Sequence, residues 1–158
     1  MTSPAWLPEI ITLNDHDGNW QNYIDAVYAV FENDFIKSKC HLKGKEVGVR
    51  RETSYDGKWF TFWHCVSEGR IEEDRTPDFR RSERVPWIRP TIEHETEDTV
   101  DVWTTKKNRE QRLYLWVNEE YIVVLGVRKK YFLLITAFPT NRTHTVEKLR
   151  RERDSNQS

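Results

Sequence analysis

The sequence predicts an α+β fold, in which an N-terminal helix, a β-hairpin and a short helix precede an antiparallel four-stranded β-meander and a C-terminal helix. Three observations predict it. Apolar residues recur at helical spacing from Trp20 to Ile36. Four β-rich runs follow one another between Val100 and Phe138. Only three polar residues separate the second run from the third, and three more separate the third from the fourth. We expect the helices to pack on one face of the sheet.

The chain of 158 residues is long enough for one domain with one hydrophobic core. Aromatic residues make up 13% of it, so few side chains can fill that core, while the charged fraction of 32% indicates a polar surface. Within a single domain covering 1–158, we expect residues 1–18 to form an N-terminal arm, 19–154 the folded α+β unit and 155–158 a frayed tail.

The first helix follows Asn19, whose side chain can accept a hydrogen bond from a free backbone N–H group of the first turn. Its apolar stripe includes Tyr23, Val27 and Phe31. Such a stripe can stack on nucleic-acid bases, but packing against a core is its usual role.

A two-stranded ribbon is expected next, because Asp56-Gly57 is a strong hairpin-turn signal. Its strands are 46–52 and 59–66, which are rich in β-branched and aromatic residues. Alternation along the second strand places His64 on one face with Phe60 and Phe62, at the boundary of the core.

A short helix is expected to begin at Thr76-Pro77, where a capping hydroxyl precedes a proline. Pro86 and Pro90 should stop or kink it. It would show Arg80 and Arg84 on one face with Arg81 beside them. A polar loop over 94–99 should lead to the meander.

The meander is expected to contain strands at 100–104, 112–117, 121–127 and 131–138. Alternation in the last strand places Leu134, Thr136 and Phe138 on one face. Val146 and Leu149 stand at helical spacing after Thr143, which predicts the C-terminal helix.

Several classes of protein are disfavoured by the sequence. A net charge of −1 argues against retention on nucleic acid by overall charge. There is no Gly-rich phosphate loop, nucleophile elbow or HExxH, and Cys40 and Cys65 lack zinc-site spacing, so we expect no metal and no cofactor. Without a secretory leader or a membrane-spanning apolar run, the chain is expected to be cytoplasmic, with reduced thiols and no membrane partner.

The remaining reactive groups suit RNA cleavage by the 2′-hydroxyl, which needs proton transfer and cations at the phosphorane but no metal. His64 is the candidate for proton transfer, Arg81 and Arg84 for a phosphate clamp and Thr136 for a phosphate ligand. Candidate substrate-binding residues are Arg75, Arg80, Glu83, Trp87, Arg128 and Tyr131. Alternative roles are a hydrogen-bonded structural histidine, arginines in surface ion pairs, a tryptophan in the core and a threonine chosen as a strand former.

Four segments resemble a known superfamily: 62–69, 75–87, 121–125 and Thr136-Ala137-Phe138-Pro139. They are similar to small prokaryotic and phage-associated proteins of the barnase, EndoU, colicin and RelE superfamily of metal-independent ribonucleases. The resemblance spans roughly 45–151. It implies a helical N-terminal part, a four-stranded antiparallel sheet whose concave face cleaves RNA, and service as a toxin or defence effector. By position, it assigns His64, Arg81, Arg84 and Thr136 to the site.

The sequence therefore predicts an endoribonuclease that acts on RNA such as tRNA or mRNA and leaves a 2′,3′-cyclic phosphate. Its expected partner is a neutralising antitoxin or regulatory protein, acidic in character so that it can cover the arginine-rich face. Two alternatives remain open. One is a non-catalytic module that binds RNA or protein, and the other is an accessory domain that pairs through the edge strand of the meander.

Overall fold

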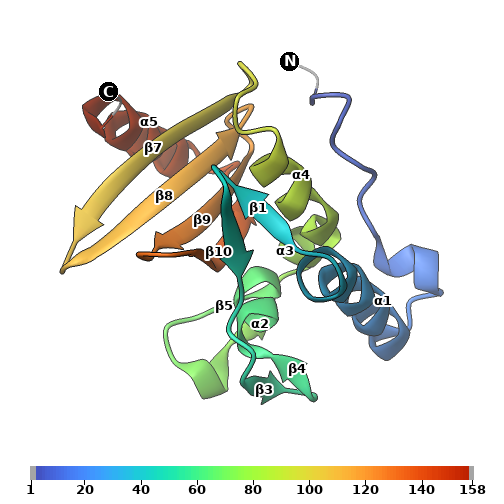
Figure 1. The fold of residues 1–158 in the computed structure, drawn as a ribbon. Helices are drawn as coiled ribbons and strands as arrows, with labels where there is room; N and C mark the ends of the chain where they lie inside the picture. Colours follow the sequence, from blue (N-terminus) through green and yellow to red (C-terminus); the bar gives the residue numbers. More distant parts are fainter. Residues whose placement is uncertain (1–2, 157–158) are drawn as a thin grey trace.

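The computed structural model describes residues 3–156. They form a six-stranded sheet in the order β1-β2-β10-β9-β8-β7, flanked by helices (Figure 1). Two further pairs of very short strands lie outside this sheet. The α+β class is confirmed, but the main sheet has six strands instead of four.

The predicted meander is confirmed in order and direction. Its strands are β7 (Val100–Lys107), β8 (Glu110–Val117), β9 (Tyr121–Val127) and β10 (Phe132–Pro139). Each pairs antiparallel with the next. The first two strands are longer than predicted because their polar residues still pair across the hairpin, down to Lys107 opposite Glu110.

The two additional strands are β1 (Cys40–Leu42) and β2 (Lys45–Gly48), which form an antiparallel hairpin. β2 also runs parallel to β10, with Val47 opposite Phe132. Pairing between strands this far apart in the chain leaves no local signal in the sequence, which is why a four-stranded sheet was expected.

The first helix, α1 (Trp20–Glu32), begins as predicted at Asn19, whose side chain accepts a hydrogen bond of 2.9 Å from the Asn22 N–H. It continues into a π-helical turn, η2 (Asn33–Lys37), and follows a 3-10 turn, η1 (Leu13–His16). Residues 3–18 of the arm are packed against the domain. The indole N–H of Trp87 donates to Pro8 O at 2.8 Å, and Trp6 stacks on His94.

The predicted second strand at 59–66 is wrong, because residues Phe60–Val66 form a helix, α2. The Asp56-Gly57 turn does exist, and both residues have positive φ. It joins β3 (Thr53–Tyr55) to β4 (Lys58–Trp59) in a separate small hairpin. α2 packs against β10 and buries side chains that a strand would divide between two faces, so tertiary packing overrides the β propensity of this segment.

After α2 the chain forms β5 (Ser67–Glu68), η3 (Glu72–Asp74), β6 (Thr76–Pro77), α3 (Phe79–Glu83), η4 (Val85–Trp87) and α4 (Ile88–Glu93). The helix predicted from Thr76 therefore starts later. Thr76 and Pro77 pair with β5, and the carboxylate of Asp78 caps α3 by accepting from the Arg80 N–H at 3.0 Å. Pro90 lies in the first turn of α4, where its missing N–H costs no helical hydrogen bond.

Both faces of the sheet are covered, contrary to the expectation of helices on one face (Figure 1). The main core contains Leu115 and Leu125 and packs against α1, α2 and α4. A second cluster contains Trp103, Trp116 and Leu149, which belongs to α5 (Thr143–Asn156). Apolar side chains on both faces of β8 and β9 require this second cover.

The last helix also extends beyond its predicted end, because Ser155 and Asn156 are helical; residues 157–158 lie outside the described part, as do 1–2 of the arm. Within 3–156, no helix combines the length and the apolar character needed to cross a bilayer.

Candidate functional site

His64 lies in the last turn of α2, with Nε2 2.8 Å from Oε1 of Glu72. Its ring stacks on Phe60, one helical turn earlier, with 4.2 Å between ring centroids. The guanidinium of Arg50 lies over the same Phe60 ring at 3.7 Å. The imidazole is thus held by a carboxylate on a neighbouring segment and by an aromatic ring of its own helix.

Glu72 is held from two sides, since its second oxygen accepts a hydrogen bond of 2.8 Å from the Ser54 hydroxyl. Burial raises the pKa of this carboxyl, but the hydrogen bonds from His64 and Ser54 outweigh burial and place the pKa below its usual value. Glu72 is therefore ionised at neutral pH.

The pKa of His64 is lowered, first by burial and then by the nearby charge of Arg75, although the hydrogen bond to Glu72 acts in the opposite direction. At neutral pH the imidazole is consequently neutral. Its Nε2–H donates to Glu72, which leaves the Nδ1 lone pair as a proton acceptor. This is the protonation state that a general base requires.

A cavity of about 200 Å³ adjoins this pair. Glu72 and Arg75 line it together with the aromatic rings of Trp20, Tyr55 and Trp63. Tyr55 and Trp63 meet edge to face at 4.9 Å, so their orientation is fixed. The cavity thus combines a cation and flat apolar walls with the carboxylate that holds His64, while the imidazole itself lies behind Glu72 and is not part of the lining.

Arg75 is the centre of a hydrogen-bond network around the end of α2. It donates to Ser67 Oγ at 2.9 Å, to Ser67 O at 2.7 Å and to Gly69 O at 2.8 Å. Arg81 also donates to Ser67 O, at 2.8 Å. Two cations at the C-terminus of a helix complement its partial negative charge. A guanidinium has five N–H groups, so Arg75 keeps donors for a ligand.

Thr136 supports the same helix end by donating its hydroxyl proton to His64 O at 2.6 Å. A β-bulge between Leu134 and Thr136 brings it there. The predicted single face for Leu134, Thr136 and Phe138 is wrong, because the bulge breaks the alternation: Leu134 lies in the main core and Phe138 against the second cluster. As a phosphate ligand, Thr136 would have to release the carbonyl.

Arg84 lies apart from His64. It pairs with Glu83 at 3.3 Å, donates to Arg80 O at 3.1 Å and lies over the ring of Trp87 at 5.1 Å. Trp87 itself is nearly buried and T-shaped to Tyr121, so it fills the core. Glu83, a predicted substrate-binding residue, holds Arg84.

A second cavity of about 180 Å³ lies on the other side of β5. It is lined by Arg80, Arg81 and Arg142, with Glu68 and Asp78. Consecutive residues of a strand point to opposite faces, which is why Ser67 lines the first cavity and Glu68 the second. The structure therefore places Arg75, with the Glu72 partner of His64, at the first cavity and the predicted Arg80 and Arg81 at an adjacent one.

The remaining predicted residues, Arg128 and Tyr131, lie at the far end of β9 and β10. Arg128 pairs with Glu110 at 3.6 Å, and Tyr131 is exposed. No contact joins either residue to His64 within the described part of the chain.

The sequence reasoning missed Glu72, Ser54 and the aromatic walls of the first cavity. The acid beside His64 is Glu72. Glu72 belongs to the acidic stretch 72–74, and its eight-residue separation from His64 fits no regular element. A better signal was the cluster of acids and arginines that follows the break at Gly69, from Arg70 to Arg75.

Across residues 3–156, no three histidine, cysteine, aspartate or glutamate side chains gather as ligands of a metal ion. Cys40 and Cys65 are buried and unpaired, and burial raises the pKa of each thiol to about 12. Neither thiol is a nucleophile at neutral pH.

Comparison with models of protein families, with curated proteins and with solved structures finds no match to this chain.

Proposed function

We propose that this protein is a metal-independent endoribonuclease that cleaves RNA through attack of the 2′-hydroxyl and leaves a 2′,3′-cyclic phosphate. The observation that carries the proposal is the neutral His64, held by ionised Glu72 beside an aromatic cavity that Arg75 also lines. A base, a cation and flat walls for a nucleobase are the groups this reaction uses. The resemblance noted in the sequence supports the same choice.

In the proposed reaction, Nδ1 of His64 accepts the proton of the 2′-hydroxyl. The 2′-oxygen then bonds to phosphorus while the bond from phosphorus to the 5′-oxygen breaks, and water protonates the departing 5′-oxygen. Glu72 stabilises the imidazolium that forms, because their hydrogen bond becomes charge-assisted. Arg75 donates its free N–H groups to the phosphorane oxygens, where negative charge accumulates.

Arg81 and its neighbour Arg80 are proposed to bind the phosphate of an adjoining nucleotide in the second cavity. Arg84 positions α3 through its bonds to Glu83 and Arg80 O. Thr136 acts through His64, whose carbonyl it holds. The predicted residues Arg80 and Arg81 thus bind phosphate, whereas Arg84 and Thr136 position other groups.

In the cell, such an enzyme would serve as a toxin or phage-defence effector in the cytoplasm. It would require a neutralising protein, because unrestrained RNA cleavage harms its host. An acidic protein that covers Arg80, Arg81 and Arg142 would block the second cavity. This part of the proposal rests on the resemblance and on the surface charge.

The test is incubation of purified protein with total RNA and with tRNA in EDTA, followed by end-group analysis. Wild type is expected to leave cyclic phosphate ends. His64→Ala should lose about 10²- to 10⁴-fold in rate, the usual contribution of a general base. His41→Ala, which alters an exposed histidine of β1, is the matched control and should retain the rate. A strict requirement for a divalent metal would contradict the proposal.

A second comparison separates positioning from direct ligation at Thr136. Thr136→Ser keeps the hydroxyl and should retain most of the activity, whereas Thr136→Val removes the bond to His64 O and should lower kcat. KM should change little if Thr136 does not touch substrate, so a KM effect larger than the kcat effect would favour the phosphate-ligand role.

The alternative function is a module that binds RNA without cleaving it. One observation favours binding without cleavage. Arg75 and Arg81 already donate hydrogen bonds to the carbonyl of Ser67, so these donors do not reach a reacting phosphate. Intact RNA with retained binding, unaffected by His64→Ala, would establish this alternative.

A further inference from the structure

An excess of positive over negative charge gathers at one end of the sheet, away from His64. Seven cations, which we call the basic sheet end, lie in or beside the β7–β8 and β9–β10 turns: Lys106, Lys107, Arg109, Arg112, Arg128, Lys129 and Lys130. Both turns lie at the same end because Arg112 of β8 pairs with Gly126 of β9, and Val127 with Phe132. The ion pair between Arg128 and Glu110 joins them directly.

The segments 105–112 and 127–132 carry these seven cations and one acid, a net charge of +6. The whole chain has a net charge of −1, so all other residues together carry −7. A polyanion is therefore attracted to this end and repelled by the remainder, which orients its approach.

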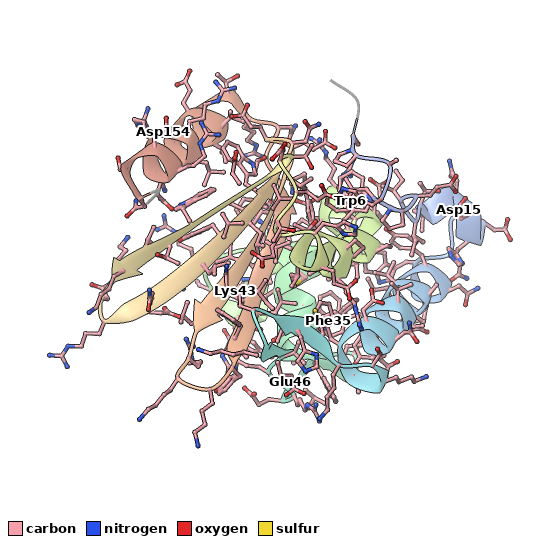
Figure 2. All side chains as sticks on the ribbon, turned by 45° about the horizontal axis from the view of Figure 1, so that its top comes forward. Trp6, Asp15, Phe35, Lys43, Glu46 and Asp154 are labelled. Carbon is pink, nitrogen blue, oxygen red and sulfur yellow. The ribbon has the colours of Figure 1, made fainter. Side chains whose placement is uncertain are left out.

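Most of these cations are free to bind a ligand. Lys106, Lys107, Arg109, Lys129 and Lys130 are exposed, and no ion pair engages them among residues 3–156. Arg112 and Arg128 share Glu110. Figure 2 shows nitrogen-tipped side chains projecting outward from the tips of the two hairpins. Exposed lysines and arginines on a rigid hairpin end are typical contacts for phosphate groups.

A groove of about 630 Å³ continues this surface between the β7–β8 hairpin and α5. Its charged lining comprises four cations, Lys106, Lys107 and Arg112 on the hairpin and Lys148 on α5, and two acids, Glu110 and Glu152. Glu110 is held by Arg112 and Arg128, and Glu152 accepts a hydrogen bond from Trp103. Tyr114 also lines it and stacks on Trp103, with 5.3 Å between ring centroids and planes 11° apart. A supported aromatic ring among cations is the combination that binds single-stranded nucleic acid, because phosphates meet the cations and a base stacks on the ring.

We propose that the basic sheet end and this groove bind a single-stranded segment of RNA and so dock the substrate outside the site of cleavage. The groove shares no lining residue with either cavity near His64. The inference rests on the proposed function for its choice of RNA as the ligand. Tyr114 distinguishes a nucleic-acid strand from an acidic protein, which needs no stacking platform.

The test measures binding of a fluorescent 20-nucleotide uridine oligomer over a series of salt concentrations, in a His64→Ala background so that the RNA stays intact. The variant combines Lys106→Gln, Lys107→Gln, Lys129→Gln and Lys130→Gln. The matched control combines Lys37→Gln, Lys39→Gln, Arg70→Gln and Arg151→Gln, which are exposed positions elsewhere. Both sets remove the same charge.

The sheet-end variant should bind at least tenfold more weakly at about 0.1 M salt. Its plot of log affinity against log salt should become shallower by about 2 to 3, since each phosphate contact to a single strand contributes roughly 0.7 to the slope. The control set should retain most of the affinity and the slope. Equal losses in both sets, or an unchanged slope, would overturn the inference in favour of a non-specific effect of net charge.

Tyr114→Ala should weaken binding by roughly five- to hundredfold without changing the slope, whereas Tyr114→Phe should bind like its parent. Equal affinity of Tyr114→Ala and Tyr114→Phe would contradict the stacking platform. Thermal unfolding of every variant excludes misfolding as the cause.

Failure of the two proposals can be told apart. With His64 present, the sheet-end variant should cleave a dinucleotide as fast as wild type, because so short a substrate does not reach the groove. RNA that binds at the sheet end but is never cleaved would refute the ribonuclease alone. Cleavage of long RNA at full efficiency by the sheet-end variant would refute the docking surface alone.

Discussion

The β7–β10 meander and the segment of residues 49–84 are held in place by different interactions. The meander has long paired strands, and Leu115, Trp116 and Leu125 are completely buried in it. The segment contains only short elements, the longest being the seven-residue α2. α2 itself packs in the main core, but the rest of the segment depends on directed hydrogen bonds, such as those of Arg75 to Ser67 and Gly69 and of Ser54 to Glu72.

This difference places the reactive groups on the less regular region. Apolar burial stabilises a sheet without selecting particular polar partners, whereas a hydrogen-bond network fixes each polar atom relative to the next. His64 needs such fixing if it is to transfer a proton. The rigid meander then serves as the support, with Thr136 as the connection between the two regions.

The largest effect is expected from the meander core. Leu115→Ala leaves a cavity at a completely buried position and should lower the free energy of unfolding by about 3 kcal/mol. Ile71→Ala, in the segment, shortens a side chain that is 59% exposed. This change should alter the free energy of unfolding by less than about 0.5 kcal/mol. Urea unfolding followed by tryptophan fluorescence measures both. Similar losses would mean that the segment has an apolar core of its own.

An intermediate effect is expected from the polar network. Arg75→Gln removes charged hydrogen bonds to Ser67, which is buried, and should cost about 2 kcal/mol. Hydrogen exchange should accelerate in residues 66–78 but not in β8 or β9, since the bonds of Arg75 lie outside the sheet. Arg70→Gln, at an exposed position, is the control. Uniform acceleration over the whole chain would show that the regions unfold as one unit.

The smallest effect is a pH dependence that belongs to the segment alone. Burial holds the pKa of folded His64 below the value of about 6.5 for an exposed histidine. As pH falls through about 6.5, the unfolded chain therefore binds a proton at His64 that the folded protein does not bind. The free energy of unfolding consequently decreases with falling pH until the pKa of folded His64 is passed. Glu72→Gln removes an interaction that raises the pKa of His64, so the pKa should fall further.

Histidine titration by NMR checks this expectation in wild type and Glu72→Gln. A higher pKa of His64 in the variant would contradict the assigned roles of burial and Glu72. The Leu115→Ala variant should leave the titration of His64 unchanged if the two regions are independent.

Local patterns in the sequence determined the meander, the start of α1 at Asn19, the Asp56-Gly57 turn and the existence of α5, because periodicity, capping and turn chemistry act between near neighbours. Residue type also singled out His64 and Arg81 as groups to examine.

Only the tertiary structure decided that 60–66 is a helix, that β2 joins β10 in parallel, and that α5 covers the opposite face. It also paired His64 with Glu72 and separated it from Arg84. Each of these outcomes depends on contacts between residues that are not sequence neighbours, or on which side of the sheet has apolar surface left to bury. Such contacts leave no periodic signal in the chain, because burial depends on the whole fold.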